Sequence, residues 1–211
     1  MLNCWQEVLA IVAAYGLGCV CTGYYLVRGL RGIDIRDYGS GSVGARNVGR
    51  VLGRAGFLVA LLGDVGKGIL AVSLARFLEL ETWGVVFVAV AVVAGHLWPL
   101  PLGGRGGKGI ATSLGALVVL DYPLVIVVFA VCAVVYLLVK HLTVGGLFAY
   151  AMLPAASVIL QRPATEVAGV VVLVLAVILA HRSNLVAILR EAREGRFAKE
   201  DRRPAAKGVS E

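Results

Sequence analysis

The chain has 211 residues, of which 59% are hydrophobic and only 16% are charged, and its formal net charge is +7. Soluble domains are about 45–50% apolar and about 25% charged, and so short a chain cannot bury the excess in a core. The composition therefore excludes an ordinary soluble enzyme, a disordered protein and a disulfide-stapled secreted domain, and it predicts a protein that resides in the lipid bilayer.

Seven apolar segments predict membrane-spanning helices. In chain order they cover about residues 5–27, 56–78, 83–98, 109–120, 124–139, 144–160 and 164–180. The fourth is the shortest, and about 12 residues cannot cross about 30 Å of hydrocarbon unaided. We expect an all-α integral membrane protein with seven transmembrane helices in a single domain over residues 1–197. This domain ends in a short amphipathic helix from about Ser183 to Arg193, and residues 198–211 are expected to form a polar, disordered tail.

The basic residues predict the orientation of these helices. With the N-terminus outside and the C-terminus in the cytoplasm, all 20 Lys and Arg residues except Lys67, Arg76 and Arg162 fall in cytoplasmic segments. This distribution satisfies the positive-inside rule. Topology therefore accounts for most of the positive charge, and nucleic acid is not expected as a partner.

Two of the cytoplasmic loops are rich in glycine, and they read GSGSVGARN over 39–47 and GGRGGKG over 103–109. Glycine-rich backbone can form concave arrays of N–H groups that bind anions, and the second loop leads into a helix N-terminus, which favours negative charge. Nearby cations strengthen the prediction of a phosphate pocket. The predicted substrate- and phosphate-binding residues are Gly41, Arg46, Asn47, Arg50, His96, Gly106, Gly107 and Lys108. Glycines inside the spans, such as Gly115, are expected to permit close helix packing instead.

Ionisable residues inside or beside a span are functional candidates. Asp64 and Lys67 lie three residues apart on one helix face, so they can pair. The pair is either a structural clasp that orients the first loop or a direct substrate contact. His181 and Asn184 are also three apart, at the cytoplasmic end of the last span, where an imidazole and an amide could hydrogen-bond a hydroxyl or a phosphate. Ordinary interfacial polarity is the alternative for these two.

Several other classes of site are not supported. The GxGxxG matches at 39–44 and 104–109 neither follow a strand nor open a βαβ unit, and the chain has no P-loop and no GxSxG elbow. None of the four cysteines forms a CxxC pair. We therefore expect no metal and no cofactor.

Three motifs, in this order, resemble those of the bacterial acyl-phosphate-dependent glycerol-3-phosphate acyltransferases, the PlsY type. The segment GSGSVGARN with Arg50 resembles that family's first loop motif, and GHLWPLPLGGRGGKGIAT over 95–112 resembles its second. The third is HRSN over 181–184 at the end of the last predicted span. The segments over 30–41 and 64–68 are also similar to the family.

The resemblance implies a multi-pass enzyme of phospholipid biosynthesis in the inner (plasma) membrane of a bacterium, with its active site on the cytoplasmic face. Its substrates would be acyl phosphate and glycerol 3-phosphate, and the enzyme that supplies acyl phosphate would be a partner. Acyl phosphate is already activated, so positioning and electrostatic stabilisation can supply most of the rate without an acyl-enzyme. Arg50 and Lys108 would then bind phosphate, while Ser40, His181 and Asn184 would orient the acceptor hydroxyl. Either His181 or a substrate phosphate would take the proton.

The chain also departs from the family pattern. Ser42 and Arg46 stand where the family has Asn and Thr, and Ala187 stands where it has Arg. These departures leave open a divergent paralogue that uses another phosphorylated acceptor or has no activity. A small transporter is a third interpretation, suggested by the intramembrane Asp64 and Lys67, although the charged groups gather at one face.

Overall fold

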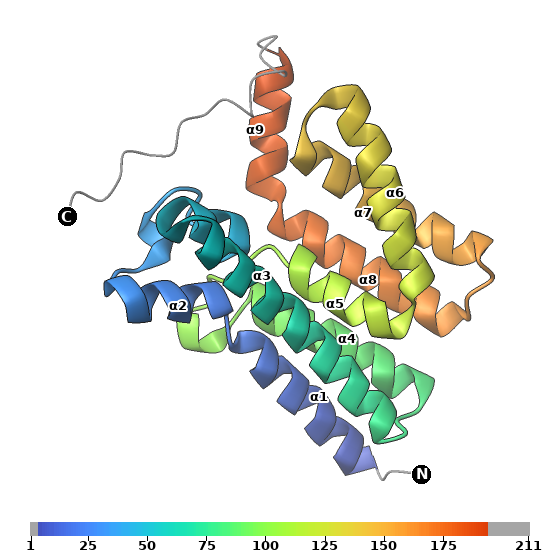
Figure 1. Cartoon of the computed structure of the whole chain (residues 1–211). Helices are drawn as coiled ribbons and strands as arrows, with labels where there is room; N and C mark the ends of the chain where they lie inside the picture. The colour runs from blue at the N-terminus through green and yellow to red at the C-terminus, as the bar shows by residue number, and fades with distance from the viewer. Residues whose placement is uncertain (1–3, 194–211) are drawn as a thin grey trace. The chain divides into compact units, whose positions relative to one another are not determined.

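A computed structural model describes residues 4–193 of the chain, and these residues are helical without a strand (Figure 1). The α-helices are α1 (Cys4–Cys19), α2 (Thr22–Arg31), α3 (Ala45–Phe77), α4 (Thr82–Leu97), α5 (Ile110–Leu120), α6 (Tyr122–Val139), α7 (Leu142–Ile159), α8 (Ala164–Ala180) and α9 (Arg182–Arg193). Two 3₁₀ turns, η1 (Ile35–Asp37) and η2 (Leu100–Leu102), lie in the loops. The chain divides between Leu120 and Asp121 into two compact units. The single domain expected over 1–197 stays a prediction, and the tail expected at 198–211 lies outside the described residues.

The apolar helices identify a membrane protein. Among the described residues, five segments are long and apolar enough to cross a bilayer, and these are Cys4–Arg31, Ala45–Phe77, Thr82–Leu102, Tyr122–Val139 and Leu142–Ile159. The pair formed by α8 and the first part of α9 is bent by 58° and makes a sixth if it counts as one span. Large apolar side chains on α6 are exposed, with Phe129 62% exposed and Leu138 78% exposed, as expected of a surface that faces lipid.

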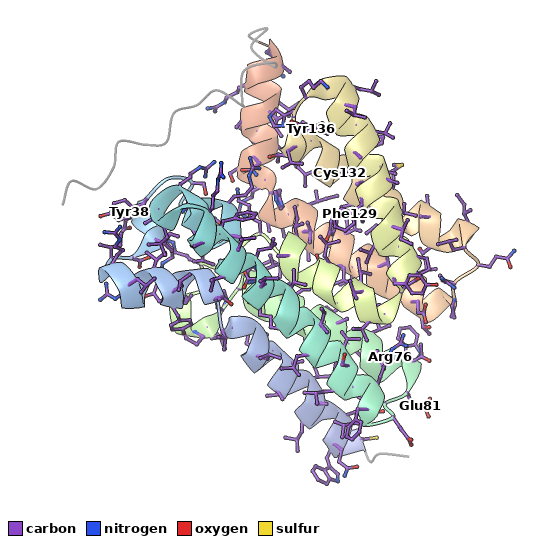
Figure 2. The ribbon with its side chains drawn as sticks, viewed as in Figure 1. Tyr38, Arg76, Glu81, Phe129, Cys132 and Tyr136 are labelled. Carbon is purple, nitrogen blue, oxygen red and sulfur yellow. The ribbon has the colours of Figure 1, made fainter. Side chains whose placement is uncertain are left out.

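The first unit contains both glycine-rich loops. Its helices α1, α3, α4 and α5 pack side by side, and α2 packs against the start of α3 (Figure 1). The glycine-rich loops lie at one end of this bundle: Tyr38, in the first loop, is far from Arg76 and Glu81, which mark the opposite end (Figure 2). The positive charge of the first loop and the acidic turn at 79–81 therefore occupy opposite ends of the unit. The orientation of these ends relative to the membrane stays a prediction.

The first predicted span is broken, whereas the sequence pattern predicts an unbroken helix over 5–27. Helix α1 ends at Cys19 and α2 begins at Thr22, and Cys21 between them is extended. Backbone that leaves a helix at membrane depth needs new hydrogen-bond partners. Lys67 of α3 supplies them, since its Nζ donates to the carbonyl oxygens of Gly18 and Val20, both at 3.0 Å.

Helix α3 begins at Ala45, well before the start at residue 56 that the apolar pattern predicts. The polar end of the first loop is thus already helical. Gly53 interrupts the helix with φ 73° and ψ −164°, a conformation that residues with a side chain rarely adopt. The kink separates a short amphipathic segment that carries Asn47 and Arg50 from the long apolar segment that carries Asp64 and Lys67.

Helix α5 is only 11 residues long and packs tightly against α3. A Cβ on Gly115 would lie 2.9 Å from the carbonyl carbon of Val65 and closer still to the carbonyl oxygen. A Cβ on Gly68 would lie 2.8 Å from the amide nitrogen of Ala116. The two backbones therefore approach through facing glycines, as expected for Gly115. Because α5 begins directly after the second loop, this packing anchors that loop to α3.

The second unit consists of α6, α7, α8 and α9, with α7 packed against both α6 and α8. An ion pair joins the start of this unit to the turn between α7 and α8. Arg162 Nε lies 2.7 Å from Asp121 Oδ2, and its second nitrogen donates to Oδ1 at 2.9 Å. Helix α9 spans Arg182–Arg193, in agreement with the amphipathic helix predicted from about Ser183 to Arg193.

Candidate phosphate-binding site

The first loop is organised around the buried side chain of Asn47. Its Oδ1 accepts a hydrogen bond from the backbone N–H of Ser40 at 2.9 Å. Its Nδ2 donates to the carbonyl oxygens of Tyr38 and Ser42, both at 2.9 Å. Gly39, with φ 58°, has no room for a side chain because Asn47 Oδ1 occupies that space. The amide thus determines the shape of the loop, and the structure places Asn47 as its scaffold while Ser40 and Gly41 lie exposed on it.

Arg36 ties the first loop to the second. Its guanidinium binds Asp34, with the closest nitrogen–oxygen distance at 2.6 Å, and donates to the carbonyl oxygen of Leu102 at 2.7 Å. The guanidinium also lies over the ring of Tyr24, 5.1 Å from its centre. The Arg36 hydrogen bonds hold the pKa of the Asp34 carboxyl below its usual range. Leu102 itself packs in a hydrophobic cluster with Val27, Ile35, Val43 and Val48. The two glycine-rich loops therefore converge, as the prediction of one pocket requires.

Sequence reasoning missed this role of Arg36 and counted it only among the cytoplasmic basic residues. The one available signal was the Asp-Ile-Arg-Asp run at 34–37, because an Asp and an Arg two residues apart can close a tight local turn. The partner at Leu102 lies 66 residues away and has no signal in the sequence.

Three cations gather where the loops meet. Arg46 and Arg50 are exposed on the first segment of α3, and Lys108 is half-buried in the second loop. Burial and the charges of Arg46 and Arg50 lower the pKa of the Lys108 ammonium from its ordinary value. An ammonium destabilised by neighbouring cations gains most from an anion that binds beside it. The electrostatics therefore favour an anionic ligand such as a phosphate.

The glycines of the second loop allow its backbone to approach the end of α4 closely. The N–H of Gly106 donates to the carbonyl oxygen of Leu97 at 3.2 Å, and the N–H of Gly107 donates to that of His96 at 3.0 Å. These amides close a turn onto the end of α4. A side chain on Gly107 would collide with the imidazole of His96. In this structure the two amides donate within the chain, so the positive charge where the loops meet comes from side chains, including Arg46, Arg50 and Lys108.

Asp64, Lys67 and His96 form one buried cluster. Lys67 Nζ lies 3.0 Å from Asp64 Oδ1, which confirms that these two residues pair. The same Nζ lies 2.8 Å from His96 Nδ1, and Asp64 Oδ1 lies 3.5 Å from that nitrogen. No more than 5% of any of these three residues is exposed. The pair thus joins α3 to α4 and to the break between α1 and α2.

His181 and Asn184 belong to the second unit. His181 is buried at the end of α8, and its Nδ1 lies 2.8 Å from the carbonyl oxygen of Val177. Because a carbonyl oxygen can only accept, Nδ1 carries the proton, and Nε2 is the basic nitrogen of the neutral ring. Asn184 is half-buried about one turn further along, on α9. The structure therefore brings together the predicted residues of the two loops, and it places His181 and Asn184 in the other unit.

Among residues 4–193, no group of three or more His, Cys, Asp or Glu side chains is arranged to hold a metal ion. Independence from metal ions stays a prediction.

The fold and these loops define a helical membrane protein in which Arg46, Arg50 and Lys108 gather where two glycine-rich loops meet in its first unit. The sequence matches the family described as "Glycerol-3-phosphate acyltransferase" over residues 8–191. It is 43% identical over 190 residues to the "Glycerol-3-phosphate acyltransferase 1" of Desulfitobacterium hafniense (strain Y51), covering 90% of this chain and 94% of that protein. It is 41% identical over 154 residues to the protein of the same name from Bacillus anthracis, covering 73% of this chain and 81% of that protein.

Solved structures agree with the sequence comparison. The crystal structure of PlsY (YgiH), described as an integral membrane glycerol 3-phosphate acyltransferase in its glycerol 3-phosphate form, matches with a TM-score of 0.80 and 27% sequence identity. This match covers 90% of the present chain and 94% of the other. A lysophosphatidic acid form matches with a TM-score of 0.79, 26% identity, and coverage of 90% and 93%. The chain belongs to the glycerol-3-phosphate acyltransferase family.

Proposed function

We propose that this protein transfers an acyl chain from acyl phosphate to the 1-hydroxyl of glycerol 3-phosphate, which yields lysophosphatidic acid and inorganic phosphate for phospholipid biosynthesis. The observation that carries the proposal is the gathering of Arg46, Arg50 and Lys108 where two glycine-rich loops meet. Both substrates carry a phosphoryl group, which needs such cations. The family, and solved relatives in glycerol 3-phosphate and lysophosphatidic acid forms, support the same acceptor and product.

The chemical step needs positioning more than covalent catalysis. The acceptor hydroxyl oxygen attacks the carbonyl carbon of acyl phosphate, and a tetrahedral intermediate forms. Its bond to the phosphate oxygen then breaks, and phosphate leaves with the bonding electrons. Arg50 and Lys108 bind phosphate, while Ser40, His181 and Asn184 orient the hydroxyl. The hydroxyl proton passes to His181 Nε2 or to a phosphate oxygen of a substrate. The tautomer of His181, with Nδ1 donating to Val177, supports Nε2 as that acceptor.

Purified protein with acyl phosphate and glycerol 3-phosphate tests the proposal directly. We expect lysophosphatidic acid and inorganic phosphate in equal amounts. Phosphate release that requires a different phosphorylated acceptor would support the divergent paralogue that Arg46 suggests. Absence of product with every acceptor, combined with uptake of a phosphorylated solute into proteoliposomes, would replace the enzyme with a transporter.

We also propose that α5 and the bent pair of α8 and α9 complete seven spans, with the N-terminus outside and the phosphate site on the cytoplasmic face of the inner membrane. The basic first loop and the acidic turn at 79–81 at the opposite end of the first unit support this orientation. Single cysteines at Glu81 and at Arg105, in a variant without native cysteines, provide the test. A membrane-impermeant maleimide should label the first in intact cells and the second only after permeabilisation. The reverse pattern would invert the topology.

A further inference from the structure

The buried cluster of Asp64, Lys67 and His96 uses every hydrogen-bond donor of the lysine. An ammonium group has three N–H donors. Those of Lys67 reach the carbonyl oxygens of Gly18 and Val20, both at 3.0 Å, and His96 Nδ1 at 2.8 Å. Asp64 Oδ1, also 3.0 Å away, balances the charge without an aligned hydrogen bond. Removal of one partner would leave a buried polar group without compensation.

These bonds determine the state of the His96 ring. Nδ1 accepts from Lys67, so in the neutral imidazole Nε2 carries the proton. The Nε2 edge faces Gly107 so closely that a Cβ on this residue would lie 2.6 Å from His96 Cε1 and closer still to Nε2. The backbone of His96 is held as well, since its carbonyl oxygen accepts from the Gly107 N–H at 3.0 Å. His96 therefore contacts the second loop through both its ring and its backbone, one residue before Lys108.

We propose that Asp64, Lys67 and His96 are positioning residues for phosphate binding. Lys67 and Asp64 fix the rotamer and tautomer of His96, and the ring supports the Gly106–Gly107 turn. This Gly106–Gly107 turn then places the Lys108 ammonium beside Arg46 and Arg50. This inference rests on the proposed function in that Lys108 is taken to bind a substrate phosphate.

The hydrogen bonds that Lys67 makes at the break between α1 and α2 do not explain why residue 96 is a histidine. Lys67 satisfies Gly18 and Val20 without any help from a ring on α4. An apolar side chain at position 96 would fill the same buried space without the cost of burying a polar group. The imidazole adds a rigid edge against Gly107 whose orientation is set by the charged pair. That orientation connects an intramembrane ion pair to the loop outside the span.

Two substitutions at His96 separate the roles of its two nitrogens. In His96→Asn, the shorter amide oxygen can take the place of Nδ1 and accept from Lys67, but no atom reaches Gly107. In His96→Gln, the amide can reach the position of Nε2, and Lys67 loses its acceptor. His141→Asn in the second unit is a matched control for exchange of a buried histidine. Its Nδ1 accepts from the N–H of Val144 as a helix N-cap, and Asn is a good N-cap as well.

We expect His96→Asn to keep the thermal stability of the wild type and to raise the KM for glycerol 3-phosphate roughly tenfold, equivalent to about 1.4 kcal/mol, with a smaller change in kcat. His96→Gln should lower stability, because Lys67 loses its acceptor. It should raise KM less than His96→Asn does, because its amide still reaches Gly107 although Lys67 no longer orients it. The control should leave KM unchanged. The proposal is overturned if both His96 variants lose stability and kcat in parallel at constant KM, or if His96→Asn keeps the wild-type KM.

Direct binding of glycerol 3-phosphate to the purified proteins, measured by calorimetry, separates this inference from the proposed function. If the wild type binds glycerol 3-phosphate and forms no lysophosphatidic acid, the proposed function fails, and the binding constants of the His96 variants still decide the inference. If His96→Asn binds as tightly as the wild type, the positioning role fails, whatever the activity.

Discussion

Replacement of Gly115 by Ala tests whether the approach of α5 to α3 sets the phosphate site. The new Cβ would lie 2.9 Å from the carbonyl carbon of Val65, whereas ordinary contacts begin at 3.4 Å. The helices must therefore separate by at least 0.5 Å, the difference between these two distances, and by more to clear the carbonyl oxygen. Gly68 faces α5 in the same way, so rotation about the helix axis offers no relief.

The magnitude follows from two opposing terms. Overpacking against backbone costs up to about 3 kcal/mol, and Ala in a helix gains about 1 kcal/mol over Gly. The net loss of about 2 kcal/mol corresponds to a fall of roughly 4–8 °C in the midpoint of thermal unfolding for a chain of this size. Because α5 begins two residues after Lys108, the same displacement should raise the KM for glycerol 3-phosphate.

Thermal unfolding of the detergent-purified variants, with steady-state kinetics on the same samples, measures both effects. Gly66→Ala is the matched control, since Gly66 lies in α3, the helix that Gly115 of α5 contacts, and has no atom within 4 Å of the added methyl group. It should keep or slightly raise the midpoint and leave KM unchanged. If Gly115→Ala behaves like Gly66→Ala, the close approach of α3 and α5 does not hold the second loop, and the reasoning is refuted.

Lys108→Ala should lower kcat/KM up to roughly 150-fold, because a charged hydrogen bond of about 3 kcal/mol is lost. The protein should still fold in membranes. Near-normal acyl transfer by this variant would show that Lys108 does not belong to the phosphate site. In the proposed site the phosphate is bound by the charged form of Lys108, which is lost as pH rises through its lowered pKa. Burial lowers that pKa, and the charge of Arg46 lowers it further. Arg46→Thr should therefore move the alkaline limb of the kcat/KM profile to higher pH, and an unmoved limb would contradict this. Asn47→Asp replaces an amide that donates to the carbonyl oxygens of Tyr38 and Ser42 by a carboxylate that cannot donate. The midpoint of thermal unfolding should therefore fall by several degrees. A stable variant with wild-type kinetics would show that the amide is dispensable. Full activity after treatment with a chelator is expected, and loss of activity that a metal ion restores would reveal a metal requirement.

Much of the architecture follows from local patterns. Long apolar runs need lipid whatever they pack against, so composition alone identifies a membrane protein. The pairing of Asp64 with Lys67 follows from three-residue spacing, because helix geometry places such residues on one face. The glycine-rich loops with their cations predict an anion site for the same reason: the relevant groups are neighbours in the chain.

Only the tertiary structure decided how distant segments of the chain contact one another. The break at Val20–Cys21 is stable because Lys67, 47 residues from Val20, satisfies the freed carbonyl oxygens. The convergence of the two loops depends on Arg36 reaching Leu102 across 66 residues. The amides of Gly106 and Gly107, which the glycine pattern assigned to phosphate, donate to α4 because that helix ends beneath them. Sequence spacing determines neighbours within a helix or loop, and only helix packing determines which carbonyl or ring those neighbours meet.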